Sequence, residues 1–268
     1  MKYPIYWVDA FARCVFRGNP AAVVPLDAWP EDALMQQIAF ENGLAETAFF
    51  VRTGADRFHL RWFTPALEVD LCGHATLGAA FTLFTQLGQG GNRIVFESRS
   101  GPLVVTRRNA ETLELDFPSR PAVLLDAPSV SPGLLRGIGG AVPSVWLKVP
   151  AHFYYLAVFR TEIEVRALRP DFAALASLGD VRVIVTAPGS DCDFVSRFFA
   201  PGAGVPEDPV TGSAHCTLVP YWAAQLGKAA LHARQVSARG GELWCELAGD
   251  RVKIAGHAVL YLRGEIVV

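Results

Sequence analysis

The strongest constraint on the fold is a repeat between the two halves of this 268-residue chain. Phe63-Thr64-Pro65 returns as Phe199-Ala200-Pro201, and Gly73-His74-Ala75 returns as Gly212-Ser213-Ala214. Both segments share one order: a strand, a Phe-x-Pro turn, an acidic residue, a glycine and an apolar helix. Similarity at about half the chain length predicts two structurally similar lobes that face each other across a cleft.

Period-two alternation predicts that strands dominate both lobes. In residues 58–62, for example, apolar and polar side chains alternate, as in a half-buried strand. Further strands are expected at residues 6–11, 21–24, 48–52, 94–97, 103–106, 113–117, 243–247, 252–255 and 259–263. Residues 6–11 and 21–24 flank the turn signal Gly18-Asn19-Pro20, which predicts a hairpin.

Two helices are predicted in the first half. Asp27 is expected to cap one of them, with Pro30 in its first turn and Asn42-Gly43 at its end. The other covers residues 77–87, starts near the glycine, and is apolar nearly all round, so we expect it inside the lobe. The predicted class is α+β, with each lobe a barrel-like sheet wrapped round one buried helix.

A change in composition marks the boundary between the lobes. Residues 118–144 contain the prolines Pro118, Pro121, Pro128, Pro132 and Pro143 and a Gly-Ile-Gly-Gly run. We therefore predict an N-terminal lobe of residues 1–125 and a C-terminal lobe of residues 126–268. The alternative is that the final strand returns to the first lobe.

Composition excludes several functional classes. Hydrophobic residues make up 51% of the chain and charged residues 19%, which excludes disorder. A net charge of -2 argues against a nucleic-acid partner, and no apolar run reaches the roughly 20 residues of a membrane span. Five scattered cysteines without a CxxC pair argue against a disulfide framework or a zinc site. With no signal-peptide pattern, these features predict a cytoplasmic protein.

The two helix starts are the first candidate binding site. Gly73 and Gly212 begin the apolar helices, where unpaired amides and the positive end of the dipole attract an anion such as a carboxylate. The alternative is that both glycines only permit tight turns. Their shared position in the repeat favours binding.

Two carboxylates are candidates for proton transfer. Glu46 lies between a turn and an apolar strand, where partial burial would raise its pKa towards a useful range; the alternative is a solvated residue at a strand edge. Asp208 precedes Gly212 by four residues and either caps a turn or lies in the cleft. Asp70 is taken as its first-half counterpart and is expected to be a cap.

Histidines and cysteines near the helix starts offer further chemistry. His74 follows Gly73 and either relays a proton or is structural, and His215 is expected to be structural. Cys72 and Cys216 suggest a two-thiol racemase. The repeat argues against this, because Cys72 aligns with Thr211. No sequence pattern for a metal site, a nucleotide or another cofactor is found, so no cofactor is expected.

Four segments resemble the phenazine-biosynthesis PhzF-like family, which has a diaminopimelate epimerase-like fold. They are VDAFARCVFRGNPAAVV (8–24), NGLAETAFF (42–50), RWFTPALEVDLCGHATLGAAF (61–81) and EDPVTGSAHCTLVPYW (207–222). The resemblance covers both halves. It implies two lobes related by a pseudo-twofold axis, a cofactor-independent isomerase and a homodimer.

The resemblance also implies roles for individual residues. Glu46 corresponds to the glutamate that moves a proton between carbons of a small carboxylated substrate, and His74 and Asp208 correspond to residues that orient it. The cleft would be lined by Gly73, Gly212, Ser213, Thr211 and Cys72. One departure is Ala45, where the family commonly has serine. The alternatives are an amino-acid-type racemase or epimerase and a catalytically silent metabolite-binding protein.

Overall fold

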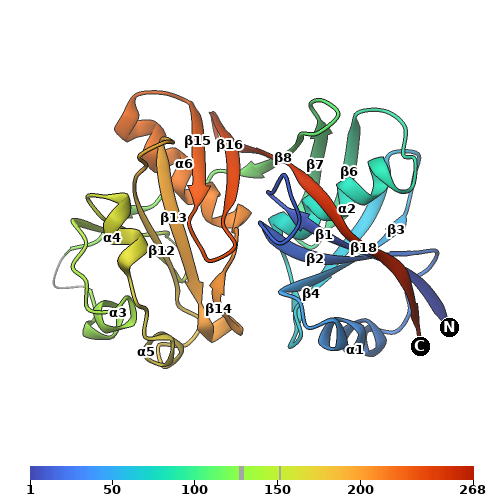
Figure 1. The fold of residues 1–268 in the computed structure, drawn as a ribbon, viewed down its shortest axis with the longest axis horizontal. Coiled ribbons are helices and arrows are strands. Elements are labelled where there is room, and N and C mark those ends of the chain that lie inside the picture. Colours follow the sequence, from blue (N-terminus) through green and yellow to red (C-terminus); the bar gives the residue numbers. More distant parts are fainter. Residues whose placement is uncertain (127–129, 151) are drawn as a thin grey trace. The chain divides into compact units, whose positions relative to one another are not determined.

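The computed structural model describes residues 1–126, 130–150 and 152–268, which form two compact units. Unit 1 contains residues 1–117 and 253–268, and unit 2 contains residues 118–252. The division at 117/118 precedes the expected boundary at 125/126, and the last strand lies in unit 1. Pro128 of the predicted crossing lies outside the described residues. Figure 1 shows the elements of each unit.

Unit 1 is built on a sheet in which strands far apart in the sequence are paired. The order β18–β1–β2–β3–β4–β6–β7–β8 follows from the pairings, and the short β5 joins the other end of β4. The strands are β1 (Lys2–Ala10), β2 (Asn19–Leu26), β3 (Glu46–Arg52), β4 (Arg57–Phe63), β5 (Glu68–Val69), β6 (Arg93–Ser98), β7 (Gly101–Arg107), β8 (Leu113–Pro118) and β18 (Ala258–Val267). β17 (Arg251–Gly256) straddles the division between the units.

Two helices cover the sheet of unit 1. Helix α2 (Gly73–Thr85) is buried along almost its whole length and packs on β1, β2 and β3, as its uniformly apolar sequence predicts. Helix α1 (Asp32–Asn42) packs through Met35 and Ile38 against a separate apolar cluster. The predicted cap at Asp27 is wrong: Glu31 is the N-cap, because the helix starts after Pro30 rather than before it.

Unit 2 has the sheet order β9–β10–β11–β12–β13–β15–β16, with β14 at the other end of β13. Its elements are β9 (Val123–Leu124), α3 (Pro132–Gly137), β10 (Val145–Lys148), β11 (Tyr154–Val158), α4 (Glu162–Ala167), α5 (Phe172–Ala176), β12 (Arg182–Pro188), β13 (Phe194–Ala200), η2 (Pro201–Ala203), β14 (Val205–Asp208), α6 (Gly212–Leu226), β15 (Ala230–Gln235) and β16 (Gly241–Ala248). The buried helix is α6, which packs on β15 and β16.

Strand pairing repeats between the two units. In unit 1, β2 pairs parallel with β3, β3 antiparallel with β4, and β4 parallel with β6. In unit 2, β11, β12, β13 and β15 pair in the same three senses. Even an ion pair is repeated, because Arg61 makes two hydrogen bonds to Glu68 and Arg197 makes two to Glu207. The duplication predicted from the sequence therefore extends to single side chains.

The register corrects one alignment made from the sequence. Trp62 opposes Val69 in unit 1, and the equivalent Phe198 opposes Asp208 in unit 2. Val69, not Asp70, is the counterpart of Asp208. Asp70 was matched to Asp208 because both are aspartates, whereas the equivalence of two positions is determined by the strand pairing.

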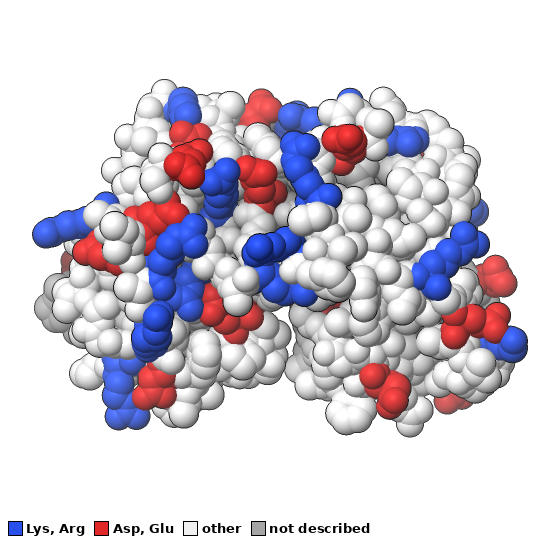
Figure 2. All heavy atoms as spheres, viewed as in Figure 1, with Lys and Arg blue, Asp and Glu red and all other residues white. Residues whose placement is uncertain are grey.

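Charged side chains of both signs are found on the face of the molecule shown in Figure 2. Figure 2 shows Lys and Arg side chains interspersed with Asp and Glu on the face in view, in keeping with the small net charge of -2. Among the described residues, none of the helices has the length and apolar character needed to cross a membrane.

Candidate active site

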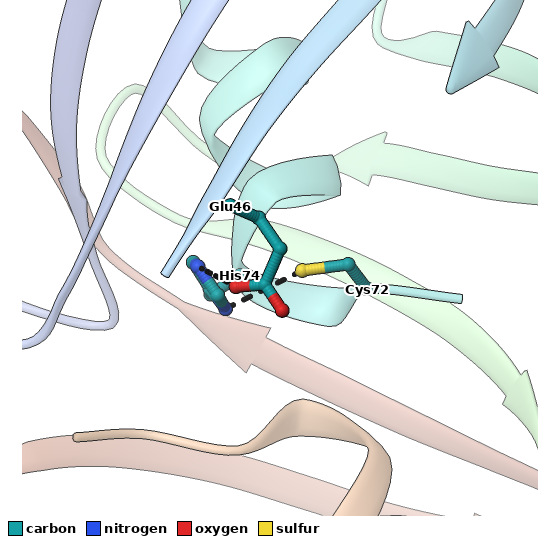
Figure 3. Close-up of side chains that lie close together, drawn as sticks. All are labelled: Glu46, Cys72 and His74. Atoms are coloured by element: carbon teal, nitrogen blue, oxygen red, sulfur yellow. Dashed lines mark hydrogen bonds and ion pairs between the residues drawn. The ribbon is translucent and has the colours of Figure 1, made fainter. Parts of the chain in front are cut away.

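Glu46, His74 and Cys72 come together in unit 1 (Figure 3). Glu46 is the first residue of β3, His74 is the second residue of α2, and Cys72 immediately precedes that helix. A carboxylate oxygen of Glu46, Oε2, lies 3.2 Å from His74 Nε2. On the other side of the ring, Cys72 Sγ lies 3.5 Å from Nδ1. Three groups able to exchange or hold a proton are thus in direct contact.

Local structure fixes each of these side chains. Gly43 ends α1 in the left-handed conformation, with φ of 61°, and allows the chain to turn into β3 within three residues. The segment following Cys72 is helical from Gly73 onward, as predicted. Since α2 packs on β3, the start of the helix is held against the start of the strand. The side chain of Glu46 remains 15% exposed, so a ligand can reach it.

His74 is enclosed by the protein and is uncharged at neutral pH. Burial lowers the pKa of His74 to about 3, because a charged imidazolium loses its hydration there. His74 Nδ1 lies 3.0 Å from Nδ2 of Asn19, the first residue of β2. We did not identify Asn19 from the sequence as a site residue. Its only signal was its place in the turn Gly18-Asn19-Pro20.

Buried histidines make the stability of the fold depend on pH. The ordinary pKa of 6.5 falls to about 3 for His74 and to about 4 for His215, both through burial. Below pH 6.5 the unfolded chain takes up protons that the folded chain does not, so the free energy of unfolding falls as the pH falls. The expected slope is up to about 1.4 kcal/mol per pH unit for each histidine.

Denaturant unfolding between pH 5 and pH 8 measures this dependence. His74→Gln is expected to reduce the slope below pH 6.5 and to leave the slope above pH 7 unchanged. Parallel curves for the wild type and the variant would contradict the assignment of His74 as a neutral buried histidine.

A second polar cluster surrounds Asp208 in unit 2. Thr211 Oγ1 donates to Asp208 Oδ2 at 2.5 Å. Gln235 accepts from the backbone N–H of Thr211 at 2.8 Å and donates to the backbone carbonyl of Asp208 at 2.7 Å. Asp208 is therefore held in place at the end of β14 by two buried polar partners. Gln235 was missed in the sequence because it lies in a distant strand and in no motif.

Both buried helices begin at the predicted glycines, Gly73 and Gly212. The N-cap residues, Cys72 and Thr211, make no side-chain hydrogen bond to the first turn. Backbone N–H groups at these ends are thus not occupied by a side-chain cap and suit an anionic ligand. Ser213 lies half-buried on the first turn of α6.

The acid–base groups of unit 1 are not repeated in unit 2. Glu46 comes directly before Thr47, which pairs with Phe63. Arg182 comes directly before Val183, which pairs with Phe199, the equivalent of Phe63. Glu46 and Arg182 are therefore equivalent positions. A carboxylate in one unit is matched by a guanidinium in the other.

The same comparison applies to the helix starts. In the repeat, His74 is matched by Ser213, and Cys72 is matched by Thr211. At these equivalent positions, unit 1 has a carboxylate, an imidazole and a thiol, whereas unit 2 has a guanidinium and two hydroxyl groups. Of the predicted site residues, the structure groups Glu46, Cys72 and His74 in one unit and Asp208 with Thr211 in the other.

The unit 1 cluster also has the donor types of a metal site. One ligand atom from each of Glu46, Cys72 and His74 lies within 4.8 Å of the others, and this is the one such group among the residues that the structure describes. These groups contact one another directly, which accounts for their closeness. We assign them no metal.

The chain matches the family model described as phenazine biosynthesis-like protein over residues 8–264. It is 53% identical over 267 residues to an uncharacterized isomerase of Pseudomonas aeruginosa, covering 99% of each chain. A phenazine biosynthesis protein of the PhzF family from Enterococcus faecalis has a crystal structure with a TM-score of 0.92, at 45% identity and 100% coverage of both chains.

A more distant likeness concerns the fold alone. The crystal structure of a probable proline racemase from Agrobacterium radiobacter matches with a TM-score of 0.63 at 12% identity, covering 99% of this chain and 93% of that one. Together these matches confirm the predicted epimerase-like α+β fold and the resemblance read from the four sequence segments.

Proposed function

Since the chain belongs to the phenazine biosynthesis-like family, we propose that it is an isomerase that moves a proton within a small carboxylated metabolite. The observation that carries this proposal is the contact of a partly exposed Glu46 carboxylate with a neutral, buried His74. Glu46 takes a proton from one carbon of the substrate and returns it to another. Such a step needs a positioned base and no cofactor.

His74 supports the carboxylate that does this work. An imidazole at 3.2 Å occupies one side of Glu46 and limits the rotation of the carboxylate. Because His74 stays neutral, it does not act as a strong acid that would give Glu46 a proton in place of the substrate. The geometry thus favours Glu46 over His74 as the group that exchanges protons with carbon.

Each unit has groups suited to recognition: the backbone amides at Gly73 in unit 1, and the amides at Gly212 with Asp208 and Ser213 in unit 2. We propose that an anionic group such as a carboxylate binds at a helix start, and that Asp208 and Ser213 bind polar groups. The hydrogen bond from Thr211 Oγ1 holds the carboxylate of Asp208 in place before a substrate arrives, which reduces the entropy lost on binding.

The asymmetry between the units supports one base rather than two. A two-thiol epimerase needs a second thiol at the position of Cys72 in the repeat, and that position is Thr211. Cys216 lies further along α6 and is fully buried, with its pKa raised by burial to about 12. A proton removed by Glu46 therefore returns to the same face of the substrate.

Replacing Cys72 separates these mechanisms. Cys72→Ser keeps the shape of the side chain, and we expect turnover to fall by less than about tenfold, because the thiol is not the base. Loss of a true acid–base group costs roughly 10²–10⁴-fold. Steady-state rates of the variant decide the question: a loss in that range would support the epimerase mechanism instead.

We also propose that the protein is a cytoplasmic homodimer. In unit 1, Phe16 and Tyr261 are exposed aromatic side chains in contact with each other, and the ring of Trp7 also contacts Tyr261. A cluster of this kind is typical of a contact surface. Light scattering after size exclusion is expected to give about twice the chain mass of 29.0 kDa. The mass of a single chain would contradict the dimer.

The activity itself is tested without knowing the substrate. The protein is incubated in heavy water with a set of small cyclic and unsaturated carboxylic acids, and their masses are followed. A substrate gains carbon-bound deuterium, or changes its retention time, only when the protein is present. The activity should survive dialysis against a chelator. Binding of an acid without any exchange would favour a metabolite-binding protein.

A further inference from the structure

We propose that Asn19 is a positioning residue that holds His74 in the tautomer with its proton on Nε2. The inference deepens the proposed function, because this tautomer places the proton on the ring nitrogen that lies beside Glu46. Three contacts carry it: Asn19 Nδ2 to His74 Nδ1 at 3.0 Å, Cys72 Sγ to Nδ1 at 3.5 Å, and His74 Nε2 to Glu46 Oε2 at 3.2 Å.

The two sides of the ring demand the same tautomer. A neutral imidazole has one N–H donor and one bare acceptor nitrogen. As the base of the proposed function, Glu46 is an ionised carboxylate, which only accepts hydrogen bonds. The ring nitrogen that lies 3.2 Å from it, Nε2, should then carry the proton. Nδ1 is then the bare acceptor. The Nδ2 group of Asn19 only donates and the thiol of Cys72 can donate, and both lie close to that nitrogen.

The chain holds Asn19 in place through the connection between β1 and β2, residues 11–18. Gly18 has φ of +66°, and a Cβ there would lie 2.1 Å from the backbone oxygen of Ala10. Phe16 also has a positive φ, of 69°, and its N–H donates to the buried carboxylate of Asp9 at 2.8 Å. Strained residues fixed in this way mark a turn whose shape is specified.

The turn delivers Asn19 to the sheet in one orientation. Asn19 opposes Ala10 in the antiparallel pair of β1 and β2, and its side chain is fully buried. Pro20 follows and restricts the backbone of Asn19 to an extended conformation. The amide group therefore reaches His74 from a rigid strand rather than from a mobile loop.

Long-range ¹H–¹⁵N correlation spectra of the imidazole rings test the tautomer directly at pH 7. His74→Gln identifies the signals of His74 by their disappearance. We expect the proton on Nε2 in the wild type. Asn19→Asp replaces the donor by an acceptor of the same shape, so the proton should move to Nδ1 or a second proton should be taken up. Asn42→Asp, at a side chain that bonds Thr47 instead, should change nothing.

The outcomes separate this inference from the proposed function. A proton on Nδ1 in the wild type would overturn it, even if Asn19→Asp failed to fold. An unchanged His74 spectrum in a folded Asn19→Asp protein would overturn it too, and would leave the role of Glu46 standing. Full turnover by Glu46→Gln would remove the proposed function but leave the tautomer as measured.

Discussion

Glu46→Gln is expected to lower turnover by at least about 10³-fold while leaving the fold intact. The substitution keeps the size of the side chain and its place beside His74, but removes the basic carboxylate. Removing the acid–base group of an enzyme costs roughly 10²–10⁴-fold, and a single base should lie at the upper end. The free energy of unfolding should change by about 1 kcal/mol or less.

A matched control is Glu97→Gln, on β6 of the same unit, where the carboxylate pairs with Arg57 at the surface. This variant should match the wild type in rate and in ligand binding. Glu46→Gln should still bind the carboxylic acids that the wild type turns over. A Glu46→Gln protein that turns over substrate at the wild-type rate would exclude Glu46 as the base.

The second large effect concerns the turn that carries Asn19. Gly18→Ala is expected to reduce the free energy of unfolding by at least about 3 kcal/mol, and to lower turnover further by displacing Asn19. The left-handed conformation costs an L-residue about 1–2 kcal/mol, and the added Cβ would also overlap the backbone of Ala10. Equilibrium unfolding in urea measures the change.

Gly43→Ala provides the comparison for this variant. Gly43 has a similar φ of +61°, but a Cβ there would meet no atom within 4 Å. The free energy of unfolding of Gly43→Ala should therefore fall only by the cost of the left-handed conformation, about 1–2 kcal/mol. Equal losses in the two variants would show that Gly18 is no more confined than Gly43, and that the β1–β2 turn does not fix Asn19.

Much of the fold was predictable because the sequence repeats it. The apolar helices that begin at Gly73 and Gly212 take the same structure in the two units. The two Phe-x-Pro segments each follow a strand, but Pro201 begins the short helix η2, which has no counterpart after Pro65. The start of α1 was missed, because both Asp27 and Glu31 are plausible N-caps around Pro30. Pairings such as β2 with β3 and β4 with β6 were not predictable, since periodicity shows that a strand exists but not its neighbour.

The candidate site was predictable in part. Glu46, His74 and Cys72 were named from their places beside turns and a helix start, and the structure brings them together. Asn19 and Gln235 were not named, because each acts through a long-range hydrogen bond that leaves no local pattern. Only the strand registers show that Glu46 and Arg182 occupy equivalent positions in the two units.

The central claim is that Glu46 is the base that exchanges protons with carbon. A crystal structure of the protein with an acid that gains deuterium tests it most directly. The account predicts that the exchanging carbon lies about 3–3.5 Å from a carboxylate oxygen of Glu46, the distance of a reactive contact. A carbon placed against another basic group, with the Glu46 carboxylate out of reach, would contradict it.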